Sequence, residues 1–489
     1  DLAAIQAGKK KLAVLGPLAN LPAAGGGGSS LVDPPYHVTA LAGLREAVGE
    51  GVELLVEPGC SIMGSDGPLV ASCLSVEVDG TRVQGLRVDY FNNVDCAGQP
   101  VVSEHEPQLQ PLYFFGNRAP REGVCDDGYS IRWAGTYTPA ASGDYYFMLT
   151  TDEKGRLRVG DQVVIDNWEH PEINIPKQGC MRLRAGECYC FELCFAKTNG
   201  FGGIRLLASA PQEECHFDRA VASAAEADAA VVFVGLNDNY EREGADRESF
   251  SLPEGQDALI LAVAAVNPNT VVALYNGTPV DMLPWVDQVA GILECWYPGQ
   301  ENGRAVANIL FGKVSPSGKL PSTFPRRLAD ASCAADYPGT DGEIHFSEGV
   351  FGGHRHFEKC GIDPLFPLGH GLSYTTFEYR DLVVSKGEGA TVAATCTVTN
   401  TGDRAGAEGV QLYVSDLVAS VERPLKELKG LQKVFLQPGE SRPVQFKLVE
   451  RDFSFYDVGL AEWTWEPGEF ALQVGASSAD IRLRAVLTL

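Results

Sequence analysis

The chain has 489 residues, 45% of them apolar and 21% charged, which is typical of a soluble globular protein with several domains. No apolar run approaches the ~20 residues of a membrane-spanning helix, so the sequence predicts no membrane span. The formal net charge of −25 disfavours nucleic acid as a partner, because an acidic surface repels phosphate groups, whereas a neutral substrate is compatible with it.

The 13 cysteines are odd in number and show no repeating spacing, which favours a reducing compartment and therefore the cytoplasm. The N-terminus carries no signal peptide: either the natural chain begins at Asp1 or upstream residues are missing. Cys188, Cys190 and Cys194 lie at even offsets on one strand face, where we interpret them as small buried hydrophobes. We predict no metal site and no cofactor.

Residues 1–86 show the pattern of an α/β domain. Residues 11–16 and 52–56 are apolar runs typical of strands, and residues 38–48 have the spacing of an amphipathic helix. Between the first strand and this helix lies a glycine-rich loop, G-G-G-G-S-S at 25–30. Because it lacks the Gly-Lys-Ser/Thr ending of a phosphate-binding loop, we expect it to line an interface or a pocket.

The pattern changes in residues 87–212, where helical periodicity vanishes and short alternating runs are separated by polar and glycine turns. This spacing predicts an all-β unit inserted into the α/β domain. We expect its strands near 86–91, 130–137, 144–150, 157–159, 163–166, 188–195 and 204–208.

The α/β pattern resumes over residues 213–378, and the alternation predicts a parallel sheet covered by helices on both faces. Residues 379–489 again alternate like strands, at the turn spacing of a β-sandwich. In the α/β part we expect helices at 218–227, 254–266 and 299–311, and strands at 229–235, 270–275 and 290–296.

Three connections follow strands of the predicted parallel sheet, at the edge where ligands bind in such sheets: residues 240–253, 276–285 and 296–301. The first crowds acidic and basic residues together, either for solubility alone or because one carboxylate donates a proton. In the last, Trp296 and Tyr297 precede a Pro-Gly turn. They are either core residues or a wall for a sugar ring.

The segment E-C-W-Y-P-G-Q-E-N-G-R at 294–304, with its continuation to Pro325, resembles glycoside hydrolase family 3, the β-glucosidases and β-xylosidases. The resemblance extends in order over nearly the whole chain. It includes the glycine loop at 25–30, E-G-A-D-R at 243–247, F-P-L-G-H-G-L-S-Y at 366–374 and R-P-L-K-E-L-K-G at 423–430.

This resemblance implies an α/β sandwich domain, interrupted by the β insertion and followed by a fibronectin type III-like β-sandwich. The insertion looks like the protective-antigen-type β domain that some members carry over the active site. Asp166 and Trp168 would then touch the sugar distal to the cleaved bond, unless they are turn and core residues. The family's TIM-type barrel, which supplies the nucleophilic aspartate, has no counterpart in residues 1–489.

Retaining glycoside hydrolysis needs two carboxyl groups about 5 Å apart, and the proton donor needs a raised pKa. By resemblance, the acid/base residue is Glu243, and Glu241 is the alternative. Gly244 would allow a tight turn beside it, and Asp246 and Arg247 would pair to hold the loop.

The predicted function is therefore that of a β-glucosidase-like hydrolase supplying the acid/base half of a site. Its partners would be a β-linked gluco-oligosaccharide or aryl glucoside and a barrel domain in the same or another chain. The alternatives are a non-catalytic carbohydrate-binding or interaction module, and an inactive fragment of the enzyme.

Overall fold

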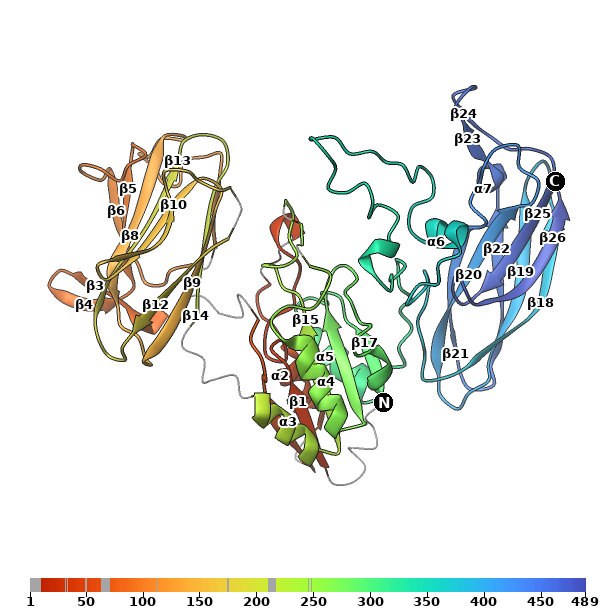
Figure 1. Ribbon diagram of the computed structural model, residues 1–489, viewed down its shortest axis with the longest axis horizontal. Helices are drawn as coiled ribbons and strands as arrows, with labels where there is room; N and C mark the ends of the chain where they lie inside the picture. The colour runs from red at the N-terminus through yellow and green to blue at the C-terminus, as the bar shows by residue number, and fades with distance from the viewer. Residues whose placement is uncertain are drawn as a thin grey trace.

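The computed structural model describes residues 10–30, 32, 34–48, 51–62, 71–110, 112–173, 176–209, 217–244, 246–247 and 249–489. Figure 1 shows a central α/β unit between two all-β units. The all-β insertion is coloured orange to yellow and the C-terminal β-sandwich blue. The predicted fold class, a parallel-sheet α/β domain interrupted by β structure and followed by a β-sandwich, is confirmed.

The α/β unit is built on one five-stranded parallel sheet with the order β17-β16-β15-β1-β2. Two of its strands precede the insertion and three follow it, so the sheet closes across the inserted unit. The strands are β1 (Lys10–Leu15), β2 (Val52–Glu57), β15 (Ala229–Gly235), β16 (Thr270–Tyr275) and β17 (Gly291–Glu294).

Helices cover both faces of this sheet, because its central strands are apolar on both sides. Side chains of α2 (Ala40–Val48) and α5 (Asn302–Leu310) share one buried cluster with Leu12 and Phe233. Side chains of α3 (Phe217–Glu226) and α4 (Gln256–Val266) pack on the opposite face. The 3-10 turns of the unit are η1 (Gly28–Ser30), η4 (Val286–Gln288) and η5 (Leu328–Asp330), whereas η3 (Ala71–Cys73) leads into the insertion.

The insertion consists of an eight-stranded and a four-stranded antiparallel sheet around one core of aromatic and branched side chains. Its strands are β3 (Leu74–Val78), β4 (Thr81–Gln84), β5 (Leu86–Phe91), β6 (Val102–Glu106), β7 (Leu112–Gly116), β8 (Tyr129–Tyr137), β9 (Gly143–Thr151), β10 (Lys154–Val159), β11 (Gln162–Asn167), β12 (Lys177–Leu183), β13 (Tyr189–Lys197) and β14 (Gly202–Ser209).

The β3–β4 hairpin belongs to the eight-stranded sheet although it lies before residue 87, where the sequence suggested that the insertion begins. Its turn is Asp79-Gly80, with φ of 50° and 76°. Asp-Gly between alternating residues is a strong hairpin signal, so this strand pair was readable from the sequence.

The interpretation of Cys188, Cys190 and Cys194, in or just before β13, as buried hydrophobes is wrong for two of them. Cys188 and Cys190 are exposed, and Cys194 is partly buried. Phe191 and Phe195 of β13 enter the core, so the residues at even positions face away from it.

The C-terminal unit is a two-sheet sandwich with strand orders β18-β19-β22 and β21-β20-β25-β26, plus a β23-β24 hairpin. Its strands are β18 (Phe377–Lys386), β19 (Val392–Asn400), β20 (Gly406–Asp416), β21 (Glu427–Leu436), β22 (Ser441–Leu448), β23 (Phe455–Asp457), β24 (Glu462–Thr464), β25 (Glu469–Gly475) and β26 (Ile481–Thr488), with α7 (Glu450–Phe453) between β22 and β23.

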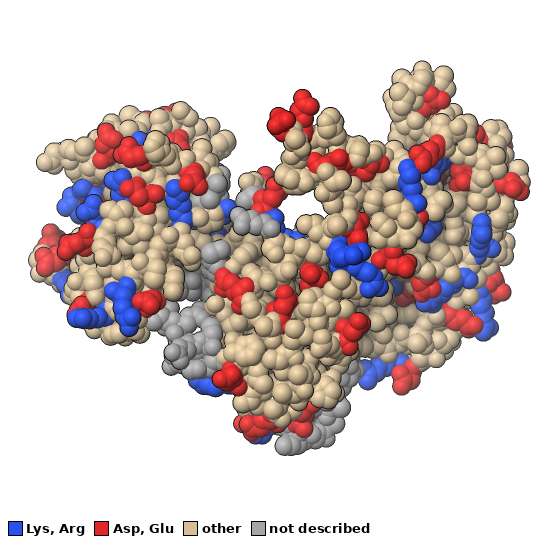
Figure 2. All heavy atoms as spheres, in the orientation of Figure 1, with Lys and Arg blue, Asp and Glu red and all other residues tan. Residues whose placement is uncertain are grey.

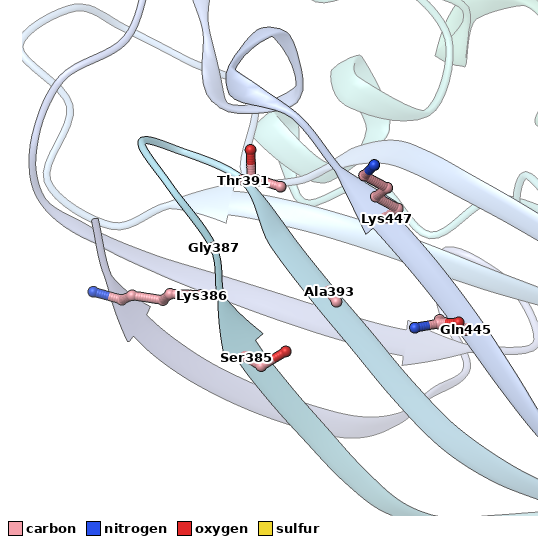
Figure 3. A pocket seen from close by; sticks show the side chains of 7 residues that line it. All are labelled: Ser385, Lys386, Gly387, Thr391, Ala393, Gln445 and Lys447. Atoms are coloured by element: carbon pink, nitrogen blue, oxygen red, sulfur yellow. The ribbon is translucent and has the colours of Figure 1, made fainter.

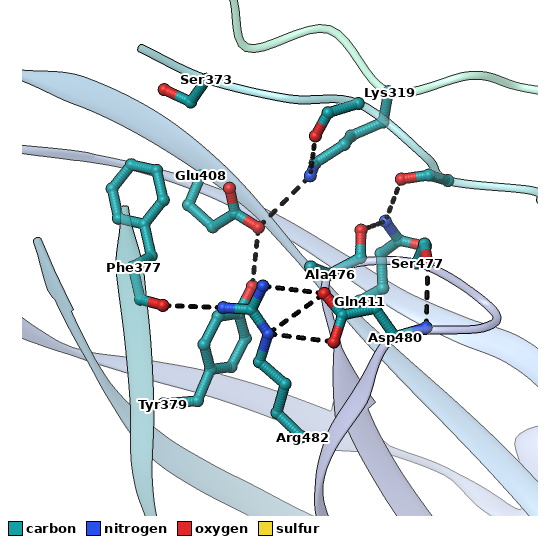
Figure 4. A network of polar contacts seen from close by, with 12 residues as sticks. Lys319, Ser373, Phe377, Tyr379, Glu408, Gln411, Ala476, Ser477, Asp480 and Arg482 are labelled. Atoms are coloured by element: carbon teal, nitrogen blue, oxygen red, sulfur yellow. Dashed lines mark hydrogen bonds and ion pairs between the residues drawn. The ribbon is translucent and has the colours of Figure 1, made fainter. Parts of the chain in front are cut away.

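A polar network joins the last part of the α/β unit to this sandwich (Figure 4). Lys319 Nζ lies 3.3 Å from Glu408 Oε1 of β20, and Tyr379 Oη donates to the same carboxylate. Gln411 Nε2 donates to the Gly369 and Ala476 carbonyl oxygens at 3.0 and 2.7 Å. These groups are largely buried, so the joint fixes the sandwich against the α/β unit.

On the face shown in Figure 2, acidic and basic side chains are interspersed over all three units. Within the described ranges, no helix is long and apolar enough to cross a membrane.

The helices α2 and α5 touch through glycine backbones, so this contact tolerates no side chain. A Cβ on Gly303 would lie 1.9 Å from Thr39 O, and one on Gly43 would lie 2.0 Å from the Gly303 carbonyl carbon. We expect Gly303→Ala to lower the free energy of unfolding by about 1–3 kcal/mol through overpacking, although alanine favours helices. Denaturant unfolding monitored by circular dichroism measures this. Gly291→Ala is the control, because its added Cβ meets nothing within 4 Å.

Candidate active site

The glycine-rich loop lies directly against the acidic connection that follows β15. Gly27 and Arg242 form a parallel bridge, in which Gly27 N donates to Glu241 O at 3.0 Å and Glu243 N donates to Gly27 O at 3.3 Å. The bridge joins segments more than 200 residues apart in sequence, on either side of the insertion.

Glycine is required in this loop by the close approach of the two backbones. A Cβ on Gly27 would lie 2.6 Å from the Arg242 Cβ, and one on Gly28 would lie 2.5 Å from the Glu243 Cβ. Gly28 also has a φ of +75°, which L side chains rarely adopt. The glycines therefore let the acidic segment approach, and its side chains take their directions from that contact.

Glu243 is exposed, and Ser29 holds its carboxylate. Oε2 accepts a hydrogen bond from Ser29 N at 2.9 Å and another from Ser29 Oγ. These two bonds lower the pKa of Glu243 below its ordinary value. The expected rise in pKa is therefore not found, because the two hydrogen bonds from Ser29 outweigh the opposing effect of desolvation. Gly244, next in the chain, has the predicted turn conformation with a φ of +78°.

Glu241 points to a different set of partners. Its carboxylate accepts hydrogen bonds from Gly277 N, from Thr278 Oγ1 and, at 2.7 Å, from Tyr297 Oη. Three donors on one partly buried carboxylate tie the loops after β15, β16 and β17 together. We call Glu241, Gly277, Thr278 and Tyr297 the Glu241 clamp.

The predicted ion pair between Asp246 and Arg247 is not formed. Asp246 accepts from Tyr337 Oη, whereas Arg247 Nη2 donates to Pro279 O at 2.7 Å. Burial lowers the pKa of Arg247, and its Nη1 is buried without a hydrogen-bond partner. Asp246 and Arg247, although adjacent in sequence, thus hold the loop against two different segments.

Trp296 and Tyr297 are both partly buried at this edge. Trp296 has a φ of 53°, which is an outlier for a bulky residue, and its N–H donates to Glu294 Oε1 at 3.0 Å. Its ring meets Phe324 edge to face, with centroids 6.0 Å apart. The sequence predicts a strand that runs to residue 296, but this turn ends it at Glu294. The turn also directs Tyr297 towards Glu241.

The insertion residues singled out by the sequence bond within their own unit. Asp166 accepts from Arg156 Nε and from Trp168 N, both at 3.1 Å. The Trp168 side chain is only 8% exposed, with Lys154 and Arg156 over its ring. These contacts match the turn-and-core alternative for both residues.

An ion pair that no local sequence pattern predicts connects the insertion to the acidic connection after β15. Arg205 Nη1 of β14 contacts Asp238 Oδ2, and the two side chains are 24% and 15% exposed. Asp238 also faces Arg242, whose pKa burial lowers. The Arg205–Asp238 pair thus fixes the inserted unit beside Glu241 and Glu243.

A separate hollow of about 310 Å³ lies on the outer face of the C-terminal sandwich (Figure 3). No carboxylate lines it, so it offers no acid/base pair. Its lining residues are Ser385, Lys386, Gly387, Thr391, Ala393, Gln445 and Lys447.

If Ser29 sets the protonation of Glu243, Ser29→Ala should raise the pKa of Glu243 towards its ordinary value, because the hydroxyl bond is lost. A carboxyl carbon NMR titration of glutamate-labelled protein measures the pKa. Ser30→Ala is the matched control, because the Ser30 hydroxyl donates to Gly27 O instead. Equal titration curves for the wild type and Ser29→Ala would contradict the assignment.

If the Arg205–Asp238 pair anchors the insertion, Arg205→Met should increase the radius of gyration measured by small-angle X-ray scattering. Asp238→Asn should do the same, and the double variant should add nothing further, since the two residues share one contact. The exposed Arg158 of β10 provides a control: Arg158→Met should leave the scattering unchanged.

Comparison with known proteins identifies the family. Residues 5–374 match the glycosyl hydrolase family 3 C-terminal domain, and residues 408–478 match a fibronectin type III-like domain. A probable β-glucosidase I from Aspergillus terreus is 35% identical over 513 residues, covering 96% of this chain and 59% of that protein. A β-glucosidase from Rhizobium radiobacter is 35% identical over 492 residues, covering 96% of this chain and 58% of that protein.

Solved structures agree. The chain resembles a β-glucosidase from Kluyveromyces marxianus in complex with glucose, with a TM-score of 0.84 and 30% identity over 98% of this chain and 59% of that one. DesR, a β-glucosidase from Streptomyces venezuelae in complex with D-glucose, has a TM-score of 0.70 and 31% sequence identity. The match covers 100% of this chain and 57% of that one. The chain spans less than two thirds of the length of these relatives. The chain belongs to glycoside hydrolase family 3 and carries the family's C-terminal domain followed by a fibronectin type III-like domain.

Proposed function

We propose that this chain supplies the acid/base half of a retaining β-glucosidase-type active site, with Glu243 as the proton donor. The supporting observation is the position of Glu243: it projects from the carboxyl edge of the parallel sheet, where Ser29 and the Gly27–Arg242 bridge orient it. It is also the glutamate of the E-G-A-D-R motif by which this sequence resembles the family, and it is exposed. Glu241, the alternative, already accepts three hydrogen bonds from the Glu241 clamp.

The reaction needs a second carboxyl group about 5 Å from the first. The nucleophilic carboxylate attacks the anomeric carbon while Glu243 protonates the departing glycosidic oxygen. This leaves the sugar bonded to the nucleophile. Glu243 then removes a proton from water as the water oxygen attacks the anomeric carbon, which breaks the bond to the nucleophile and releases the sugar. We assign the nucleophile to a barrel domain, in the same or another chain, because residues 1–489 contain no barrel motif.

A barrel lying over Glu243 accounts for the protonation that the reaction needs. Alone, the carboxylate is exposed and its pKa is lowered by Ser29. Covering it with protein removes water, and the nucleophile brings a negative charge close; both raise the pKa of a carboxyl group. In this proposal the proton donor is completed only in the assembled site.

We further propose a neutral β-linked gluco-oligosaccharide or aryl glucoside as substrate, since two of the similar structures hold glucose. The net charge of −25 does not repel such a molecule. Trp296 and Tyr297 would line the edge of the site. Asp166 and Trp168 would act from the insertion only if a substrate long enough to reach them displaced their internal contacts.

The test is Glu243→Gln in the chain joined to, or mixed with, a family 3 barrel. For an alkyl β-glucoside, which needs acid assistance, we expect kcat/KM to fall by about 10²–10⁴-fold. For a dinitrophenyl β-glucoside the rate of the first step should fall much less, because its leaving group needs no proton. Unchanged activity in Glu243→Gln would refute the assignment, and the same leaving-group pattern in Glu241→Gln would transfer the role to Glu241.

The binding-module alternative has its own test. Isothermal titration of the chain alone with cellobiose should give no binding that depends on Trp168, because that ring is buried. Binding that survives Glu243→Ala and is lost on Trp168→Ala would favour a non-catalytic module instead.

A further inference from the structure

Glu294, the last residue of β17, has an unusual environment at the same edge of the sheet. Its Oε1 accepts a hydrogen bond from Trp296 N at 3.0 Å. Its Oε2 is out of contact with solvent and has no hydrogen-bond partner. Among the described residues, no lysine or arginine forms an ion pair with it, so an ionised carboxylate would be left without compensation.

Asn276, which follows β16, also carries a buried oxygen without a hydrogen-bond partner. It is fully buried, its Nδ2 donates to Thr278 O at 2.8 Å, and its Oδ1 has no partner. Glu294 ends the neighbouring strand β17, where it pairs with Leu274, so the side chains of Asn276 and Glu294 lie at the same sheet edge. With Glu294 ionised, the two unpaired atoms are both acceptors, and each loses its hydration. One proton on Oε2 makes a donor and satisfies both atoms.

We propose that Glu294 is held as a neutral carboxylic acid that donates to Asn276 Oδ1, accepts from Trp296 N, and so positions the Glu241 clamp. The positioning follows the chain: the Trp296 N–H bond holds the left-handed turn, and the turn aims Tyr297 Oη at Glu241. Glu241 in turn holds Gly277 N. The link between this clamp and catalysis by Glu243 rests on the proposed function. The protonation state of Glu294 is independent of that function.

The electrostatic surroundings support a neutral acid. Burial, followed by a weaker contribution from the Glu241 charge, raises the pKa of Glu294 to about 8. The hydrogen bond from Trp296 N and, more weakly, the Asn276 side chain oppose this rise without cancelling it. The other titratable group against Glu294 is the thiol of Cys295, whose pKa burial also raises. Both neighbours are neutral or negative, so neither favours ionisation of Glu294.

The first experiment measures protonation without enzyme activity. Difference infrared spectra of the 489-residue chain, wild type minus Glu294→Gln, should show a carboxylic-acid C=O band at pH 6 that disappears above pH ~8. The matched control is Glu301→Gln: Tyr36 and Arg304 lower the pKa of Glu301, so this substitution should remove no such band. Absence of the band in the Glu294→Gln difference overturns the proposal.

The pH dependence of the melting temperature tests the protonation of Glu294 independently. The folded pKa is raised above the ordinary 4.5, so folding retains a proton between pH ~4.5 and ~8. The stabilisation is complete below this window and is lost as pH rises through it. Wild-type melting temperature should therefore fall across the window relative to that of Glu294→Gln, whose amide keeps both hydrogen bonds. Parallel profiles would overturn the proposal.

The positioning role is tested by amide hydrogen exchange at Gly277, which reports the clamp. Glu294→Leu removes both hydrogen bonds and should accelerate this exchange at least tenfold, whereas Glu294→Gln should not. Equal exchange in the wild type and a folded Glu294→Leu would refute the positioning role. If Glu294→Leu does not fold, Asn276→Asp provides the second variant: it places a carboxylate against Glu294 and should also accelerate exchange.

Discussion

The contact between the glycine loop and the acidic connection is the constraint on which the candidate site depends. Gly27 pairs with Arg242 at a distance that leaves no room for a Cβ. This pairing joins the part of the α/β unit before the insertion to the part after it, and it fixes three successive side chains. Glu241 reaches the neighbouring loops, Arg242 faces Asp238, and Glu243 meets Ser29. Without the close approach, none of these directions is defined.

Three carboxyl groups at one sheet edge differ in chemistry because their surroundings differ. Glu241 has three donors, Glu294 is buried with one donor and an unpaired oxygen, and Glu243 is exposed. Only the exposed group is accessible to a substrate, and the two others brace the loops. The inserted unit is attached to the same edge through Arg205 and Asp238, so its placement and that of the acidic loop are linked.

Most of the fold could be predicted from local patterns. The strand at residues 270–275 and the all-β units follow from hydrophobic period, which depends on neighbours in sequence. The errors have local causes as well. Asp79-Gly80 is a local hairpin signal, whereas the end of β17 at Glu294 cannot be read from the sequence, because the left-handed turn at Trp296 depends on a side-chain contact. For Cys188 and Cys190, periodicity was right but the choice of the inner face was wrong.

The sequence by itself determined the family, the order of the units and the motif that contains Glu243, because these are carried by residue types and spacing along the chain. The tertiary structure decided which partner each side chain meets. It separated Asp246 from Arg247, brought Ser29 to Glu243 across more than 200 residues, and placed Asn276 against Glu294. Hydrogen bonding and desolvation act through space, so the protonation of these carboxyl groups could not be read from their spacing.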